Sequence, residues 1–240
     1  MKVINLISGP RNLSTALMYS FAQRENTAVL DEPFYAHYLL NGNAAVTHPS
    51  EKKICATMER DEVKIVENIH KISEDKYVFI KGMAHHYLSD TPDFILKWNN
   101  IILIRHPENL LASFSKVIET PTIKDIGIKK ASELFTYLDA KGKTPLVIDS
   151  DELLKDPPAY LKKICELLEI SFTEKMLRWK KGGILEDGIW AKHWYKNVHN
   201  SEGFAIQKSS GQQMPKRLQP VLDEAQHYYA ILKNHILKNN

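Results

Sequence analysis

The sequence contains few cysteines and no long apolar run. Cys55 and Cys165 are its two cysteines, and neither belongs to a CxxC pair or to a His/Cys cluster with metal-ligand spacing. We therefore expect reduced thiols in a cytoplasmic protein and no metal site. The apolar segment Val3–Ile7 is interrupted at once by Ser-Gly-Pro-Arg, and no window reaches the length of a membrane span. These features predict neither a signal peptide nor a membrane partner.

The charge of the chain is nearly balanced. The formal net charge is +3 over 240 residues, with 43% hydrophobic and 25% charged residues. This charge is too small to indicate a nucleic-acid partner, but it is compatible with local basic residues around a phosphorylated ligand. The length predicts one domain over residues 1–240, with a core at 1–170 and a helical and loop extension at 171–240 packed on it. No sequence feature indicates a particular oligomeric state.

Short apolar, β-branched runs alternate with helical patterns along the chain, which predicts an α/β fold with a parallel sheet flanked by helices. The expected strands are Val3–Ile7, Ala28–Leu30, Tyr77–Ile80, Ile101–Ile104 and Leu146–Ile148. The expected helices are Ser14–Arg24, Asp61–Ile72, Glu108–Ile118, Ile126–Ala140 and Pro158–Glu169, followed by a helix near 173–179 and a C-terminal helix near 215–237.

The segment Ser8–Thr15, SGPRNLST, joins the first expected strand to the first expected helix. Such a turn directs free backbone N–H groups and a helix N-terminus to one spot, which favours anion binding. Ser14 and Thr15 can cap the helix and offer hydroxyl groups, and Arg11 adds a guanidinium. A capped turn without a ligand is the alternative.

The same segment differs from the ATP-binding loop GxxxxGK[ST]. Counting from Gly9, Ser14 stands at the second Gly, Thr15 at the Lys and Ala16 at the magnesium-binding hydroxyl. The phosphate-binding lysine and the metal ligand are therefore both missing, which argues against a kinase or NTPase.

A second anion site is indicated after the fourth expected strand. Arg105 follows that strand, at the edge where ligands bind in open α/β sheets, and Ser113 lies eight residues later on the following helix. Pro107 and Glu108 suit the start of this helix. A surface salt bridge for Arg105 is the alternative.

These two sites, in this order, resemble the sulfotransferases that use 3′-phosphoadenosine-5′-phosphosulfate (PAPS). In that family a PRSGTT-like loop holds the 5′-phosphosulfate, and a strand-end Arg with a Ser eight positions later holds the 3′-phosphate. Asp149–Leu168 resembles the family's YEDMKEDP segment, and Lys180–Trp194 its RKG…GDWKNHF region. The resemblance implies a P-loop NTPase-like fold and PAPS contacts from Arg11, Asn12, Ser14, Thr15, Arg105, Ser113, Lys181 and Gly182.

The chain departs from the family's pattern at the loop. Leu13 replaces the loop glycine, and Ala16 replaces the aromatic residue that stacks on adenine. The resemblance therefore supports the phosphate contacts more than an adenine pocket.

A candidate catalytic base follows the second expected strand. Glu32 opens a Glu-Pro turn on the same rim as the phosphate loop, and the carbohydrate-modifying branch of the family uses a Glu in a similar context. An ion pair with Arg11 or a nearby lysine is the alternative role for Glu32. The rival bases are His85 and His86, displaced by two and three residues from the family's histidine and otherwise expected to be solvated or hydrogen-bonding residues. Lys81 can neutralise charge at the sulfuryl group or reach out to solvent as a strand-end lysine.

The leading interpretation is metal-free, in-line transfer of a sulfuryl group from PAPS to a hydroxyl or amine of a small-molecule acceptor, with Glu32 as base and Arg11 and Lys81 stabilising charge. Acceptor recognition is expected from residues 36–53, 85–92 and 183–211. The alternatives are a non-catalytic nucleotide- or phosphate-binding module, a small-molecule kinase, and an aminotransferase that uses pyridoxal phosphate.

Overall fold

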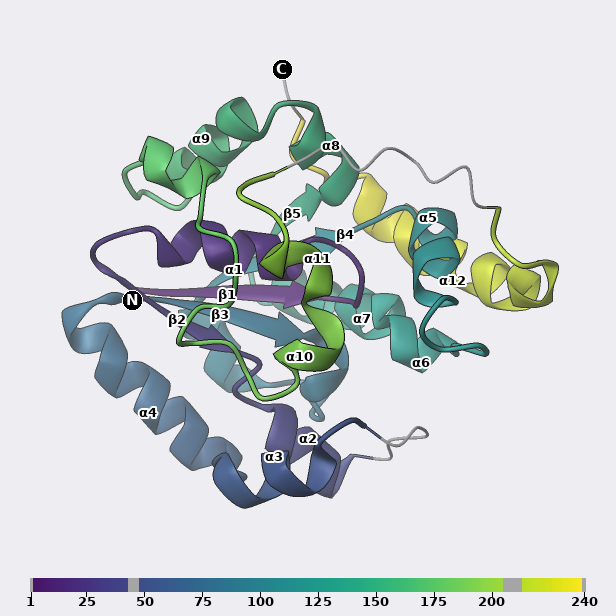
Figure 1. The fold of residues 1–240 in the computed structure, drawn as a ribbon, viewed down its shortest axis with the longest axis horizontal. Helices are drawn as coiled ribbons and strands as arrows, with labels where there is room; N and C mark the ends of the chain where they lie inside the picture. The colour runs from purple at the N-terminus through teal and green to yellow at the C-terminus, as the bar shows by residue number, and fades with distance from the viewer. Residues whose placement is uncertain (1, 43–47, 205–212, 239–240) are drawn as a thin grey trace.

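The computed structural model describes residues 2–42, 48–204 and 213–238. In this part of the chain five parallel strands form one sheet with the order β2-β3-β1-β4-β5 (Figure 1). The strands are β1 (Val3–Ser8), β2 (Thr27–Asp31), β3 (Tyr77–Met83), β4 (Asn99–Ile104) and β5 (Leu146–Asp149). All five expected strands are confirmed, as is the parallel sheet.

Helices cover both faces of this sheet and also form the C-terminal extension (Figure 1). They are α1 (Ser14–Ala22), α2 (Tyr35–Asn41), α3 (Glu51–Thr57), α4 (Glu62–Asp75), α5 (Pro107–Phe114), α6 (Ile123–Ile126), α7 (Ile128–Ala140), α8 (Ser150–Lys155), α9 (Pro157–Leu167), α10 (Ala191–Trp194), α11 (Lys196–His199) and α12 (Gln219–Lys233). Short 3₁₀ turns are η1 (Ala84–His86), η2 (Asp93–Lys97), η3 (Glu174–Leu177) and η4 (Lys216–Leu218).

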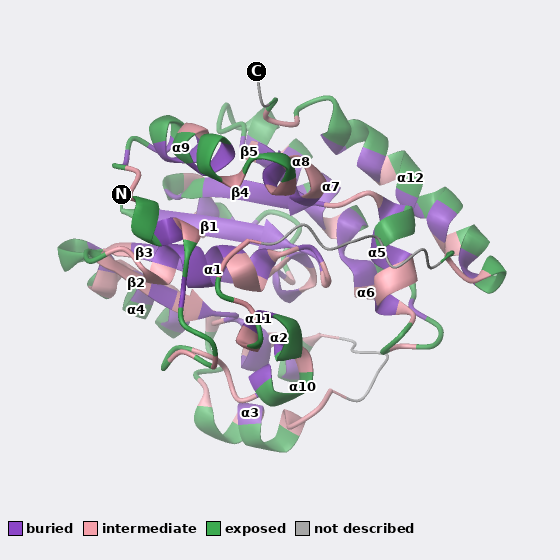
Figure 2. Ribbon diagram, turned by 45° about the horizontal axis from the view of Figure 1, so that its top comes forward, coloured by how far each residue is buried: buried purple, intermediate pink, exposed green. Residues whose placement is uncertain are grey.

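The sheet separates two apolar layers, which gives the three-layer arrangement of a P-loop NTPase-like fold. In β1, Val3 and Ile7 face the layer that includes α4, α7 and α12, whereas Ile4 and Leu6 face the layer that includes α1 and α9. Figure 2 shows the strands buried and the outer faces of the helices exposed. Burial on both faces explains why these strands are apolar at consecutive positions.

The extension contributes to both layers. Leu222 and Ala225 of α12 pack with α7 in one layer, and Trp190 and Tyr195 pack in the other. Beyond α12, the amide of Leu237 donates to the carbonyl of Val147 at 2.8 Å. No helix in the described ranges is long and apolar enough to cross a membrane.

Some expected helix limits are wrong. Residues 36–53, expected as a recognition loop, contain most of α2 and part of α3. Residues 43–47 of this segment, and residues 205–211 of the expected recognition segment 183–211, lie outside the described residues. The helix expected at 126–140 is divided at Gly127, whose φ of 70° ends α6. The helix expected near 173–179 is only the turn η3. Short helices of this kind have too few residues for a clear periodic pattern.

The strand register brings the expected site residues to one edge of the sheet. Ser8 at the end of β1 pairs with Met83 of β3, and Asp31 at the end of β2 pairs with Lys81 of β3. Because all five strands are parallel, the phosphate loop after β1, Glu32 after β2 and Arg105 after β4 leave the sheet at this same edge.

Candidate active site

The loop between β1 and α1 has an unusual backbone. Arg11 and Leu13 adopt positive φ values of 60° and 66°, and Leu13 is the N-cap of α1 without a side-chain hydrogen bond. The expectation that Ser14 or Thr15 caps the helix by its side chain is therefore wrong, because both already lie in its first turn. The amides of that turn have no carbonyl partner within the helix. Together with the left-handed residues they form a concave set of N–H donors suited to an anion.

Asn12 and Gly9 fix this loop to its neighbours. The Nδ2 atom of Asn12 donates to the carbonyl of Leu103 in β4 at 2.9 Å, and the Oγ atom of Ser150 donates to the carbonyl of Asn12 at 2.9 Å. A Cβ atom at Gly9 would lie 2.3 Å from the carbonyl oxygen of Ile126, so the close approach requires glycine. The side chain of Asn12 therefore anchors the loop.

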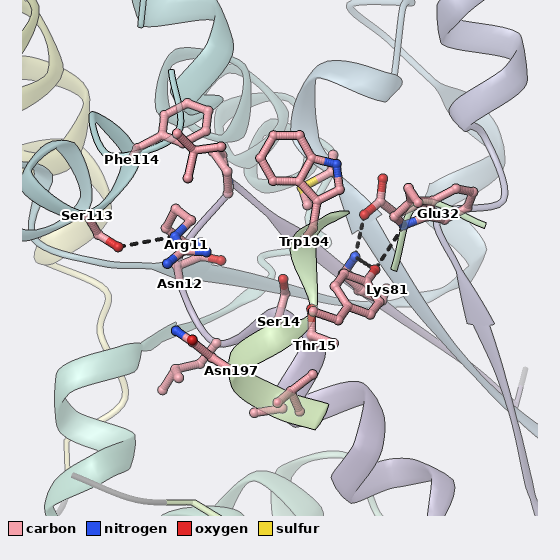
Figure 3. Close-up of a pocket in the computed structure, with 18 of the residues that line it drawn as sticks. Arg11, Asn12, Ser14, Thr15, Glu32, Lys81, Ser113, Phe114, Trp194 and Asn197 are labelled. Carbon is pink, nitrogen blue, oxygen red and sulfur yellow. Dashed lines mark hydrogen bonds and ion pairs between the residues drawn. The ribbon is translucent and has the colours of Figure 1, made fainter. Parts of the chain in front are cut away.

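Arg11 and Ser113 lie together at one end of the site (Figure 3), and Arg105 lines the same cavity. The Nε atom of Arg11 donates to the Oγ atom of Ser113 at 3.1 Å, and an Nη atom of Arg105 donates to the carbonyl of Arg11 at 2.8 Å. Burial, and next the charge of Arg105, lower the pKa of Arg11. Asp151 lies 3.9 Å from the buried Nε atom of Arg105, which has no hydrogen-bond partner among the described residues. Two adjacent guanidinium groups with so little countercharge are suited to binding an anion.

Lys81 and two carboxylates occupy the other end of the site (Figure 3). The side chain of Lys81 is fully buried, so the expectation of a lysine that reaches solvent is wrong. Its Nζ atom donates to Asp31 at 3.0 Å, to the Oη atom of Tyr195 at 2.5 Å and to Glu32. The expected ion pair of Glu32 with a nearby lysine is thus present. A buried ammonium shared by two carboxylates is compensated without water.

Asp31 and Glu32 differ in their surroundings. Asp31 also accepts hydrogen bonds from the Oη atom of Tyr195 at 2.8 Å and from the amide of Gly188 at 2.9 Å. Glu32 is buried at a positive φ of 48°. Burial raises the pKa of Glu32 to about 7, with Lys81 opposing this shift and Asp31 adding to it. A carboxylate with such a pKa can accept a proton near neutral pH.

His86 is buried and His85 is half-buried, so neither is a fully solvated histidine. The His86 side chain is 2% exposed, and its Nε2 atom lies 4.0 Å from Glu32. Burial lowers the pKa of His85 to about 4 and lowers the pKa of His86 well below its usual value. Both histidines are therefore uncharged at neutral pH.

Lys181 and Gly182 are not brought to the other site residues. They lie outside the lining of the cavity, where Lys181 is exposed and 3.8 Å from Glu202. The amide of Gly182 donates to the carbonyl of His199 at 2.8 Å. The structure gives no support to a contact of these two residues with the same ligand as Arg105.

One cavity of about 550 Å³ joins the two ends of the site. Its lining includes eight of the expected site residues, which come from the loop after β1, the start of α1, the ends of β2, β3 and β4, and α5. They are Arg11, Asn12, Ser14, Thr15, Glu32, Lys81, Arg105 and Ser113. Sequence reasoning missed Tyr195 of the extension, which binds Lys81 and Asp31. No spacing signal connects a tyrosine more than a hundred residues away with β2 and β3. In the part of the chain that the structure covers, no group of three or more His, Cys, Asp or Glu side chains could hold a metal ion.

Comparisons with known proteins identify the family of this chain. A family model described as a sulfotransferase domain matches residues 1–236. The chain belongs to the sulfotransferase domain family. Three solved sulfotransferases share the fold of this domain at low sequence identity. They are the sulfotransferase domain of the Synechococcus PCC 7002 olefin synthase (TM-score 0.59, 15% identity, 95% of this chain and 94% of that one), that of the curacin biosynthetic pathway (0.54, 15%, 96% and 96%), and a sulfotransferase from Alicyclobacillus acidocaldarius (0.52, 14%, 96% and 94%).

Two Arabidopsis thaliana proteins are more similar in sequence. They are named branched-chain-amino-acid aminotransferase-like proteins 2 and 1, and each is 38% identical over 98% of this sulfotransferase domain. The chain spans 42% of the length of each of these relatives.

Proposed function

We propose that this domain transfers a sulfuryl group from PAPS to a hydroxyl or amine of a small-molecule acceptor. The observation that carries the proposal is the distribution of charge in one cavity. Arg11 and Arg105 offer nearly uncompensated guanidinium groups at one end, and Glu32 lies with Lys81 at the other. Such a cavity suits an anionic donor beside a base that acts on an uncharged nucleophile.

The residues present fit a donor with two phosphate positions. The amides of the loop and the hydroxyl groups of Ser14 and Thr15 would hold the 5′-phosphosulfate, since the loop backbone is already turned toward an anion. Arg105, Ser113 and the side chain of Arg11 would hold the 3′-phosphate. The Arg11–Ser113 hydrogen bond favours this place for Arg11 over a contact with the transferred group. The buried Nε atom of Arg105 is a donor available to such a phosphate.

The chemical step follows from the other end of the cavity. The acceptor oxygen would attack the sulfur in line while its proton passes to the carboxylate of Glu32. The bond from sulfur to the bridging phosphate oxygen breaks, and 3′-phosphoadenosine-5′-phosphate (PAP) leaves with that electron pair. Lys81 would stabilise the charge that develops during transfer, because two carboxylates hold it as an ammonium.

We do not extend the aminotransferase name of the Arabidopsis relatives to this chain. The chain matches less than half of each relative, over a segment with a sulfotransferase fold. The buried Lys81 is held as an ammonium by Asp31 and Glu32, and an ammonium lacks the electron pair needed for an imine with pyridoxal phosphate.

Titration calorimetry with PAP, AMP and ATP tests the proposed donor. PAP carries the 3′-phosphate, so it should bind at least tenfold more tightly than AMP, and ATP should not match it. Equal binding of the three nucleotides, or binding of none, would overturn the proposal. Tight PAP binding without transfer to any acceptor in a broad panel would instead favour a non-catalytic binding module.

A further inference from the structure

A cluster of rings encloses the cavity beside Glu32. The ring cluster consists of Tyr35, Tyr38, His48, His85 and His86, all of which line the cavity. The ring of His86 stacks on those of Tyr35 and Tyr38, with centroid distances of 4.7 and 4.9 Å. His85 and His48 contact the ring of Tyr38 edge-on at 5.0 and 5.7 Å. The cluster therefore lines this end of the cavity with aromatic rings.

The ring cluster has no positive charge at neutral pH. Burial lowers the pKa of each of its imidazoles, His48, His85 and His86. The buried Nδ1 atoms of His85 and His86 have no hydrogen-bond partner among the described residues. A neutral imidazole nitrogen can accept a hydrogen bond, so two polar positions of the cluster are left for a ligand to satisfy.

The charges around the ring cluster are mainly negative. Asp125 lines the cavity and acts electrostatically on Tyr38, His48 and His85. Its Oδ2 atom caps α6 by accepting from the amide and hydroxyl of Thr122, and it forms no ion pair with any described residue. The ammonium of Lys81, which acts electrostatically on His86, is already shared by two carboxylates.

We infer that the acceptor is a small hydroxyl-bearing organic cation, such as an amino alcohol or a phenolic amine. Its ammonium group would lie between the ring cluster and Asp125, and its hydroxyl would reach Glu32. Aromatic faces attract cations, and a nearby carboxylate adds charge complementarity. The inference rests on the proposed function for the placement of the hydroxyl at Glu32.

The same features disfavour anionic acceptors and large ones. A carboxylate or sulfate group at the ring cluster would meet Asp125 and the negative faces of the rings, whereas the guanidinium groups of Arg11 and Arg105 lie at the other end of the cavity. The cavity of about 550 Å³ also has to hold the donor, so the acceptor is small.

Binding to the PAP-saturated protein tests this inference without relying on turnover. Calorimetry at pH 7.5 would compare three single-ring phenols that differ in charge: tyramine, 4-methylphenol and 4-hydroxyphenylacetate. Tyramine should bind roughly tenfold more tightly than 4-methylphenol, and 4-hydroxyphenylacetate should bind most weakly. Equal or tighter binding of either of the latter two, or no binding of any, overturns the inference.

An Asp125→Asn variant tests the charge itself. Asparagine keeps an oxygen that can cap α6, so the fold should persist while the advantage of tyramine over 4-methylphenol falls at least threefold. Asp156→Asn is the matched control, because Asp156 caps α9 at an exposed position outside the cavity lining. An unchanged preference in Asp125→Asn overturns the assignment. A preference for tyramine in binding, with no sulfuryl transfer, would reject the proposed function but retain the inferred ligand class.

Discussion

The Nζ atom of Lys81 lies 3.0 Å from the Oδ1 atom of Asp31, in an ion pair whose side chains are almost completely buried. Adjacent strands create this pair, because Asp31 of β2 is in register with Lys81 of β3. Tyr195 of the extension donates to the same carboxylate at 2.8 Å. Asp31 therefore stays paired with Lys81 when Glu32 gains or loses a proton, so the buried ammonium keeps a countercharge.

Replacing Asp31 by Asn should weaken Glu32 as a base. The charge of Asp31 contributes to the raised pKa of Glu32, so its removal lowers that pKa and leaves Lys81 to Glu32 alone. We expect the acid limb of the kcat profile to move to lower pH and the plateau kcat to fall roughly threefold or more. Steady-state transfer measured between pH 5 and 9 checks this, with circular dichroism to confirm folding. An acid limb that stays in place would show that Asp31 does not act on the base.

Glu32→Gln should abolish transfer while preserving donor binding. The amide cannot accept the acceptor proton, and kcat should fall on the order of 10²- to 10⁴-fold. In the wild type, burial raises the pKa of Glu32 to about 7, so activity should decline as the pH falls through this value and the carboxylate becomes protonated. PAP formation and PAP calorimetry check the two expectations. Activity of Glu32→Gln within tenfold of the wild type would exclude Glu32 as the base and redirect attention to His86.

The strands and the place of the site follow from local patterns in the sequence. Val3–Ile7 and Ile101–Ile104 are apolar on consecutive positions because both faces of a parallel strand are covered. Once the sheet is parallel, strand-end residues such as Glu32 and Arg105 must emerge at one edge. The loop between β1 and α1 therefore lies where the sequence predicts it, although the left-handed Leu13 and the absence of a side-chain cap do not follow from the sequence pattern.

The rest of the site depends on contacts that only packing creates. Tyr195 reaches Asp31 because the extension packs on the layer that includes α1, and nothing in its local sequence indicates this contact. The burial of His86 likewise depends on stacking against Tyr35 and Tyr38. A family resemblance also placed Lys181 at the ligand, whereas the structure places it beside Glu202 outside the cavity lining.

Arg105→Ala should reduce the discrimination between PAP and AMP. The guanidinium of Arg105 lies beside Arg11, and both residues are proposed to bind the 3′-phosphate. AMP lacks this phosphate, so PAP affinity should fall roughly tenfold or more while AMP affinity changes little. Calorimetry with both nucleotides measures the difference. Arg217→Ala is a suitable control, since among the described residues Arg217 donates only to the carbonyl of Glu119, at an exposed position. An equal loss of affinity for PAP and AMP would assign Arg105 to the phosphate that both nucleotides share.

Gly9→Ala should distort the phosphate loop. A Cβ atom at this position would lie 2.3 Å from the carbonyl oxygen of Ile126, a backbone atom that cannot turn aside as a side chain could. Relief of this clash must displace the loop or α6, so the free energy of unfolding should fall by about 1–3 kcal/mol and PAP affinity should fall roughly tenfold. Thermal unfolding and calorimetry measure the two effects.

Gly142→Ala is the control that separates general strain from damage to the site. Gly142 has a φ of +67°, yet no atom lies within 4 Å of an added Cβ, and the residue is not part of the cavity lining. Alanine there should lower the free energy of unfolding by about 1 kcal/mol through backbone strain alone and leave PAP affinity unchanged. If Gly9→Ala also keeps wild-type PAP affinity despite its lower stability, the backbone of Ser8–Thr15 is not the part of the chain that holds the donor.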